Sequence, residues 1–464
     1  MDARLWAGQE FATIDVGDAR LGARVAMLAS RLVEHPNSSL PDACGGWAET
    51  KAAYRLFDND RVTADAIIRA HSDATQARIT ALGEDRILIA HDTTTLNYTT
   101  HHAAEGMGAI GASGLRGFFV HSAQAISIHG VPLGLLAQQR MFRPVPDPVE
   151  TEDEEASTPH ATRRRPPNER ESRRPIDVLT ASTSVLPPHL HAISIADREA
   201  DFYDFLATGI HQKLDLLIRA VHDRALDQEG SPRLREAVQT TAPLGSVTVD
   251  VPRSGNRASY RATLELRACP VLLCAPQNTE HHGKPSLPLW AILAQQTGAA
   301  PRAKEEPITR WLLTTLAVPD LATARQLLTW YTFRWRVERF HYTLKSGCQV
   351  EKLQLETADR MERAVAMYSV IASRLQYLTY LARTEPGLPA SIALSPTELE
   401  VLARKCTGSP PTAPPDLHTA VRWIAQLGGF LGRRREGEPG VKVLWRGLRA
   451  LHFLVEGWEL AHLR

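Results

Sequence analysis

Cysteine, long apolar runs and net charge are all scarce in this sequence of 464 residues. Its five cysteines are scattered and form no C-x-x-C pair, which argues against a disulfide framework or a structural zinc site and favours a reducing cytoplasm. No apolar run approaches the roughly 20 residues that cross a bilayer, and nothing resembles a signal peptide, so we expect no membrane partner. The formal net charge is +1, so any nucleic-acid surface must be local.

What is present is the composition of an ordinary soluble globular protein, with 43% hydrophobic and 23% charged residues. The length allows roughly two to four domains. Near the start, Leu21, Val25, Leu28 and Leu32 form an apolar helical stripe, and "WAETKAAYRLFDND" gives a second helix that ends in turn residues. We therefore predict a helical domain over residues 1–75.

Short apolar runs typical of strands follow from residue 86. "RILIAHD", "GFFVHSAQAISI" and "VPLGLLAQQRMF" predict a meander, and "HAISIAD" predicts a further strand before a helix from Phe202. "SVTVDV" and "SYRATLEL" alternate around "RSGNR", which predicts a hairpin. Residues 143–175 are rich in proline and charge, which predicts a long loop or disordered insertion. The chain ends in helices joined by "GSPPTAPPD".

Two of the predicted strands lead directly into an aspartate. Asp92 follows residues 87–91, and Asp197 follows residues 191–196. An aspartate just past an apolar strand lies at the carboxyl edge of the sheet, where open α/β sheets place their chemistry. A turn residue or helix cap is the alternative interpretation of either one.

The stretch "YTFRWRVERFHYTLK", residues 331–345, has polar residues at helical spacing. On a helix of about 100° per residue, Tyr331, Arg334, Glu338 and Lys345 fall within about 60° of arc. Large apolar residues occupy the opposite side: Phe333, Val337, Phe340 and Leu344. The polar face is either a solvated surface with an Arg334–Glu338 pair or a functional site.

Together, the two aspartates and Glu338 give three carboxylates without a histidine or cysteine cluster. Such hard oxygen ligands suit Mg²⁺ or Mn²⁺ better than zinc. A pair of these ions roughly 4 Å apart is the usual arrangement for phosphodiester chemistry. Arg334 and Lys345 would then hold the DNA backbone beside the metals.

These motifs resemble those of bacterial DDE transposases of the insertion-sequence-four family, in the transposon-five-like group. The spacing Y-x2-R-x3-E-x6-K resembles the family's signature, and "AHDTTTLNY" and "ADREADFYD" resemble its two aspartate segments. "GDARLGAR" and "KAAYRLF" resemble its terminal-repeat-binding domain, and "LGGFLG" and "PGVKVLWRGLRAL" its C-terminal helices. The resemblance thus runs through nearly the whole chain in the family's order.

The resemblance implies an α/β fold, an RNase H-like core with a mixed sheet flanked by helices, interrupted by a β-rich insertion, between helical terminal domains. The expected divisions are a DNA-binding domain for terminal inverted repeats (1–75), the first part of the core with the 143–175 loop (76–210), the insertion (211–310), the second part of the core with the glutamate helix (311–378) and a dimerisation region (379–464).

The resemblance also implies the activity and its residues. Asp92, Asp197 and Glu338 would be the metal-binding catalytic triad, with two Mg²⁺ ions or Mn²⁺ as a substitute. Water would cleave one strand at the element's end, the 3′-hydroxyl would form a hairpin, and the reopened ends would join target DNA. A flipped base would lodge against Trp311 and Tyr331. The partners would be double-stranded DNA and a second copy of the chain, in the bacterial cytoplasm at the nucleoid.

Arg219 matches, less closely, a DNA-contacting position of the inserted domain, and Trp311 alone could equally be a core tryptophan. One departure concerns "ERESRRPID", which keeps Glu171 and Ser172 but lacks the family's following tryptophan. Three alternatives stay open: an RNase H-like nuclease or resolvase, an inactive or domesticated DNA-binding descendant, and a two-carboxylate glycosidase. The last leaves Arg334 and Lys345 unexplained.

Overall fold

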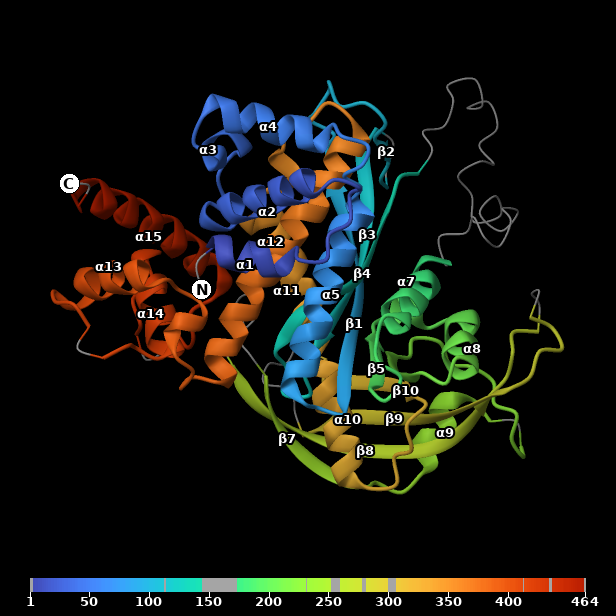
Figure 1. Cartoon of the computed structure of the whole chain (residues 1–464). Coiled ribbons are helices and arrows are strands. Elements are labelled where there is room, and N and C mark those ends of the chain that lie inside the picture. The colour runs from blue at the N-terminus through green and yellow to red at the C-terminus, as the bar shows by residue number, and fades with distance from the viewer. Residues whose placement is uncertain are drawn as a thin grey trace.

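The structure is a computed structural model that describes residues 3–111, 114–143, 173–230, 232–251, 259–277, 281–298, 306–411, 413–433 and 436–462 (Figure 1). Its N-terminal part is helical, as predicted, and comprises α1 (Ala3–Glu10), α2 (Ala19–Glu34), α3 (Leu40–Cys44), α4 (Trp47–Phe57) and α5 (Ala64–Leu82). The stripe predicted on α2 is buried at Val25, Leu28 and Leu32. The side chain of Asp18 caps this helix by accepting the N–H of Arg20.

Ten strands of the described residues form one mixed sheet at the centre of the molecule. Its members are β1 (Arg86–Asn97), β2 (Gly108–Ala109), β3 (Arg116–Ile126), β4 (Pro132–Met141), β5 (His191–Ala196), β6 (Asp215–Arg219), β7 (Gly245–Val251), β8 (Tyr260–Leu273), β9 (Leu287–Thr297) and β10 (Thr309–Thr314). The order is β2-β3-β1-β5-β6-β10-β9-β8-β7, and β4 pairs with β3.

The pairing divides this sheet into two stretches. β4, β3 and β1 form the predicted antiparallel meander, and β5 and β6 then add parallel to β1. This order, β4-β3-β1-β5-β6, is the mixed sheet of an RNase H-like core. β10, β9, β8 and β7 continue the same sheet with antiparallel pairing, so the strands expected of an insertion extend the core sheet (Figure 1).

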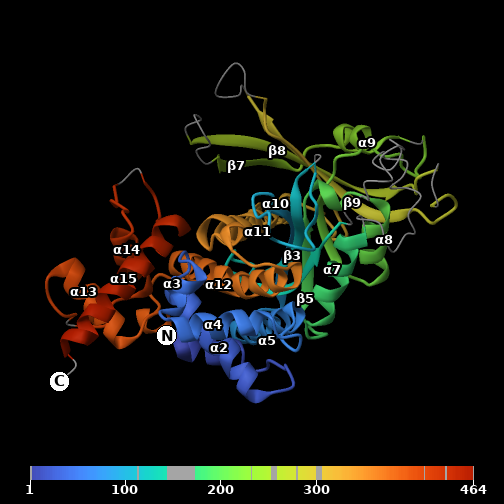
Figure 2. The same cartoon turned by 90° about the horizontal axis from the view of Figure 1, so that it is seen from above.

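Helices cover both faces of the central strands. α5 and α12 (Ala358–Thr384) lie on one side, and α7 (Arg173–Ser184) and α8 (Tyr203–His211) lie on the other (Figures 1 and 2). The apolar run Ile87–Ala90 is fully buried, as this double covering requires. α9 (Leu234–Thr240) packs against β8 and β9.

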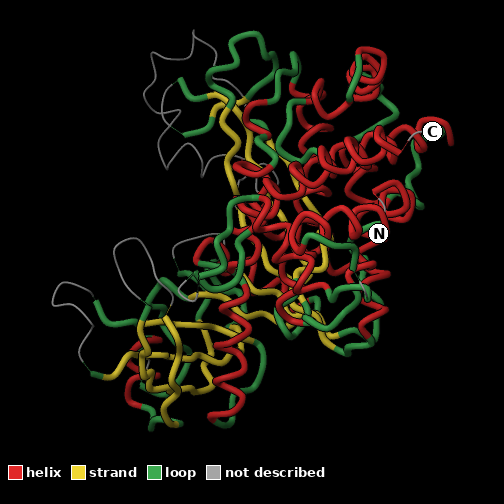
Figure 3. The backbone as a smooth tube through the Cα atoms, turned by 90° about the vertical axis from the view of Figure 1, so that its left-hand side faces the viewer, coloured by secondary structure: helices red, strands yellow, loops and turns green. Residues whose placement is uncertain are grey.

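The C-terminal helices α13 (Pro396–Thr407), α14 (Leu417–Leu427) and α15 (Val441–His462) lie beside the N-terminal helices (Figure 1). Both chain ends lie on the same side of the molecule (Figure 3). Three short 3₁₀ turns are also present among the described residues: η4 (Arg198–Ala200), η6 (Val350–Lys352) and η7 (Ala390–Ile392). Within the described ranges, no helix combines the length and apolarity that a membrane span needs.

Two sequence predictions about local structure need correction. The helix expected to run unbroken over residues 331–345 is divided into α10 (Leu321–Phe333), α11 (Trp335–Tyr342) and a π-helical turn, η5 (Thr343–Gly347). The loop expected over residues 143–175 ends earlier, because α7 begins at Arg173. Most of that loop, and the "RSGNR" turn, lie outside the described residues.

Candidate active site

Asp92 and Asp197 lie at the same height on neighbouring strands. Parallel pairing of β1 with β5 ends at Ala90 opposite Ile195, and each aspartate follows two residues later. Ala90 and Ile195 both belong to the core beneath α11 and α12, so strand alternation directs the two aspartates to that same face.

The prediction that both aspartates follow a strand end is correct for Asp197 and wrong for Asp92. β1 continues to Asn97, and Asp92 lies within it, directly opposite Ser122 of β3. The β-branched threonines after Asp92 favour this continuation. Asp197 does follow β5 and also acts as a cap, because its Oδ1 accepts the N–H of Glu199 at 2.8 Å.

A fourth carboxylate lies beside the two aspartates. Burial of the Glu199 carboxyl raises its pKa, and the charges of Asp197 and Asp92 raise it further. The Thr93 side chain and Arg174 act in the opposite direction. Negative charge is therefore concentrated at this edge of β1 and β5, which favours the binding of a cation.

Glu338 approaches this region from α11 and is held by Arg334. Their side chains form an ion pair of 2.6 Å between Oε1 and Nη2, and Arg334 is only 5% exposed. The pKa of Arg334 is raised despite burial, because Tyr331, Glu338 and Asp197 all favour its charged form. Its Nε and Nη1 have no hydrogen-bond partner among the described residues.

Tyr331 is buried next to this arginine. Burial raises the pKa of its phenol, against the opposing charges of Arg334 and Arg219. On the face of the 331–345 segment that was expected to be presented for binding, Tyr331 and Arg334 are therefore enclosed. The side chains of Glu338 and Lys345 stay about one third exposed.

Lys345 does not project freely from the helix. The π-helical turn places its Nζ 2.7 Å from the carbonyl oxygen of Thr95 on β1 and 3.2 Å from Glu351. Glu351 also accepts the backbone N–H of Asn97 at 2.9 Å. Lys345 thus links η5 to the end of β1.

The structure does not bring Trp311 and Tyr331 together. Trp311 lies on β10 and packs with the core on the α8 side of the sheet, whereas Tyr331 packs with the core on the other side. Leu312 is paired with Arg219, so Arg219 shares the face of Tyr331. Trp311 is half-buried, with the Arg235 guanidinium 5.8 Å from its ring centroid.

Sequence reasoning missed one contact of the site. His341, three residues after Glu338 and therefore on nearly the same helix face, has Nδ1 3.2 Å from Oδ2 of Asp92. Its Nε2 lies 3.2 Å from Oγ of Ser122. The helical spacing of His341 from Glu338 is visible in the sequence, but its contact with a residue 249 positions away is not.

The donor chemistry of the site fits a hard divalent cation. Asp92, Asp197 and Glu338 offer only carboxylate oxygens, which are the ligands that such ions prefer. The pKa of Glu199 is raised first by burial and then by the charges of Asp197 and Asp92, and these neighbouring charges favour a cation. Over the described ranges, however, no three histidine, cysteine or acidic side chains are gathered closely enough to hold an ion as they stand.

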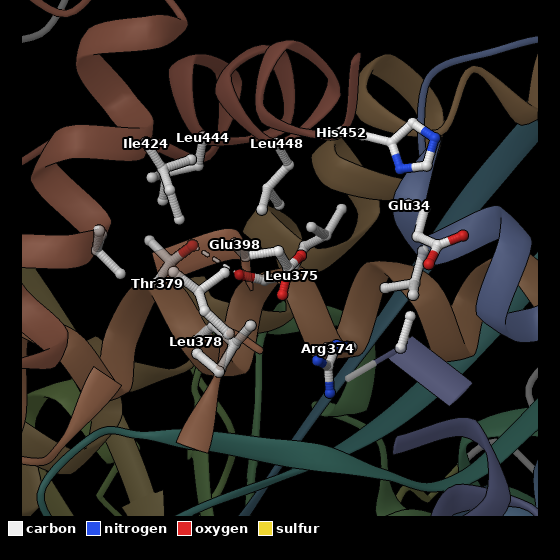
Figure 4. Close-up of a pocket in the computed structure, with 15 residues that line it drawn as sticks. Glu34, Arg374, Leu375, Leu378, Thr379, Glu398, Ile424, Leu444, Leu448 and His452 are labelled. Carbon is white, nitrogen blue, oxygen red and sulfur yellow. Dashed lines mark hydrogen bonds between the residues drawn. The ribbon is translucent and has the colours of Figure 1, made fainter. Parts of the chain in front are cut away.

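A pocket elsewhere in the molecule is unrelated to these carboxylates. It has a volume of about 60 Å³ and lies where α2, α12, α13, α14 and α15 meet (Figure 4). Leu375, Leu444 and Leu448 give it an apolar lining, with His452 and Glu34 at one end. It marks the junction of the N- and C-terminal helices.

Comparison with protein families gives three matches along the chain. A transposase DNA-binding domain matches residues 3–62, a transposase DDE domain matches residues 157–374, and a transposase Tn5 dimerisation domain matches residues 370–463. The DDE match includes Asp197 and Glu338 and begins after Asp92.

Proposed function

The chain carries the DNA-binding, DDE and dimerisation domains of a Tn5-type DDE transposase, and from this we propose that it moves an insertion sequence by cutting and pasting DNA. Water cleaves one strand at the element's end and leaves a 3′-hydroxyl. That hydroxyl attacks the opposite strand, displaces the flanking DNA and closes a hairpin. A second water opens the hairpin, and the 3′-ends then attack target DNA.

The catalytic carboxylates of this proposal are Asp92, Asp197 and Glu338. The DDE domain implies dependence on a divalent metal, which we assign to two Mg²⁺ ions, with Mn²⁺ as a substitute. Bound there, the metal would activate the attacking oxygen and stabilise the leaving one. The three side chains would serve all the steps, because each step is an in-line displacement at phosphorus.

Arg334 is the proposed phosphate ligand. Its Nη2 is paired with Glu338, but its buried Nε and Nη1 have no partner among the described residues, and such unsatisfied donors are costly unless an anion accepts from them. A DNA phosphate beside the carboxylates would supply that anion. Tyr331 packs against Arg334 and would hold it in place, and Lys345 and Arg219 would contact the backbone nearby.

Trp311 is the proposed platform for a base displaced by hairpin formation. Its ring is only partly buried, and stacking on such a ring is worth about 1–3 kcal/mol per base. Since Tyr331 faces the other side of the sheet, the proposal assigns the base to Trp311 and the phosphate region to Tyr331.

The terminal domains complete the proposed reaction. Residues within 3–62 would bind the terminal inverted repeats, and the helices within 370–463 would pair two copies of the chain. In the synaptic complex each copy would act on the DNA end held mainly by its partner.

The observation that carries the proposal is the equal height of Asp92 and Asp197 on one face of the sheet, with Glu338 and Arg334 above them. The test is a cleavage assay with Glu338→Gln and an exposed control, Glu236→Gln. DNA carrying the element's inverted repeats is incubated with each protein, with Mg²⁺ or with chelator, and the products are resolved on denaturing gels.

Metal-dependent nicks and a hairpin product, lost only in Glu338→Gln, would support the proposal. Nicks without a hairpin would instead favour an RNase H-like nuclease. Binding without any cleavage by the wild-type protein would favour an inactive descendant.

A further inference from the structure

His341 is enclosed between α11 and the central strands. It is 4% exposed, and both ring nitrogens have a polar neighbour at 3.2 Å: Oδ2 of Asp92 at Nδ1 and Oγ of Ser122 at Nε2. Asp92 and Ser122 are directly opposite each other on β1 and β3. The imidazole therefore bridges two strands from the helix that carries Glu338.

The hydrogen bonds around His341 form a chain with one direction. The Nε2 of Gln138 donates to Oγ of Ser122 at 3.2 Å and to Oγ of Ser369 at 3.1 Å. The Asp92 carboxylate can only accept, so Nδ1 of His341 carries the ring proton and donates it to Oδ2 of Asp92. With that proton on Nδ1, Nε2 is left as an acceptor for the O–H of Ser122, whose oxygen accepts from Gln138.

This chain is held rigidly because its members are buried. Ser122 and Ser369 have no exposed surface, and Gln138 is 7% exposed. Ser369 lies on α12 and Gln138 on β4, so the orientation of the imidazole is fixed from two further elements. Such a supported histidine selects one oxygen and one orientation of the carboxylate that it contacts.

The bridge also fixes the position of Glu338. His341 follows Glu338 by three residues in α11, so both side chains leave the helix on nearly the same face. Anchoring His341 on Asp92 sets the height of α11 on β1, and thereby the distance of Glu338 from Asp92. Without this anchor, Glu338 would be positioned by its ion pair with Arg334 and by the packing of Val337 and Phe340.

We propose that His341 is the positioning residue of the active site. It holds Oδ2 of Asp92 so that Oδ1 stays available to the cation, and it fixes α11 so that Glu338 can reach the same cation. This inference deepens the proposed function and rests on it. The role requires the Nδ1–H donor, and a residue that only fills space would not supply it.

The test compares three substitutions of His341 with two controls. His341→Leu removes the donor, His341→Asn restores an N–H close to the Nδ1 position, and His341→Gln restores one close to Nε2. Asp92→Asn tests the proposed metal site itself, and His102→Leu controls for loss of an exposed histidine. Thermal denaturation without metal identifies variants that fail to fold.

Two measurements are made on each folded protein. Mn²⁺ binding is followed by electron paramagnetic resonance without DNA, and the rate of strand cleavage is followed over a range of Mn²⁺ concentrations. Lost support of a metal-binding carboxylate typically costs about 10–100-fold in affinity. We therefore expect His341→Leu and His341→Gln to raise the half-saturating Mn²⁺ concentration at least tenfold, and His341→Asn to recover most of this loss.

DNA binding, measured by gel shift, should not change in any His341 variant. Equal Mn²⁺ affinity in His341→Leu and the wild type would overturn the inference and leave the residue a packing role. Equal losses of Mn²⁺ affinity in His341→Asn and His341→Gln would also overturn the inference. If Asp92→Asn also leaves Mn²⁺ binding unchanged, the proposed function has failed at its metal site, and this result is distinct from failure of His341 alone.

Discussion

Acidification should weaken the contact between the N- and C-terminal helices. His35 follows α2 as its C-cap residue, and its ring packs edge-on against His452 of α15, with the two centroids 4.0 Å apart. Burial, followed by the neighbouring His452, lowers the pKa of His35 from 6.5 to about 4. Arg449 and Arg31 also lower this pKa, and Glu456 opposes them.

The direction in which stability changes with pH follows from proton uptake at His35. The unfolded chain binds a proton at His35 near pH 6.5 and the folded chain only near pH 4, so stability falls as the pH decreases between these values. Proton linkage at His35 lowers the free energy of unfolding by about 2 kcal/mol between pH 7 and pH 5. Because the ring is only partly buried, solvent screening reduces the expected loss to about 1 kcal/mol.

The substitution His35→Phe isolates this contribution, since phenylalanine keeps the ring contact but does not titrate. Hydrogen exchange of α2 and α15 at pH 7 and pH 5, corrected for intrinsic exchange, gives the free energy of local opening. Between pH 7 and pH 5, the free energy of local opening should fall by about 1 kcal/mol more in the wild type than in His35→Phe. His102→Phe serves as a control for an exposed histidine. An equal fall in the free energy of local opening in the wild type and in His35→Phe would refute the reasoning.

Three further predictions concern other parts of the fold. Glu10→Gln should lower the free energy of unfolding in urea by about 3 kcal/mol, since buried Glu10 pairs with Arg78 at 2.8 Å. Gly447→Ala should lower thermal stability and the exchange protection of α15 by about 1–3 kcal/mol, because a Cβ would lie 1.8 Å from the carbonyl oxygen of Ile424. Arg334→Lys should slow cleavage at least tenfold, on the order of a lost charge-assisted hydrogen bond, while gel shifts show nearly unchanged DNA binding.

Local sequence pattern was sufficient for most of the elements. The α2 stripe, the meander and the hairpin of β7 and β8 all follow from apolar periodicity, because burial on one face imposes that periodicity. The fold class was also predicted, with the help of the family resemblance. The pairing of β10 with β6 was not, since nothing local in either strand specifies which partner it takes.

The residues of the candidate site were proposed from the sequence, and the structure revises the geometry that was expected for them. Helical projection treats polar residues as solvent-facing, yet Tyr331 and Arg334 are enclosed. The charge of Arg334 is met by Glu338 in the same segment and by Asp197 at the end of β5. The break after Phe333 and the π-helical turn at Lys345 carry no recognisable signal. The contact of His341 with Asp92 depends on the whole fold.

These breaks divide the 331–345 segment into three parts, each of which carries one residue of the candidate site. Tyr331 precedes the break, Glu338 lies on the short helix between the break and η5, and Lys345 lies in η5, where it reaches the carbonyl of Thr95. On one straight helix, Lys345 would follow Glu338 along a single line. The π-helical turn instead directs it to β1 beyond Asp92. A DNA strand that met both Arg334 and Lys345 would therefore pass close to Glu338, which lies between them along the segment.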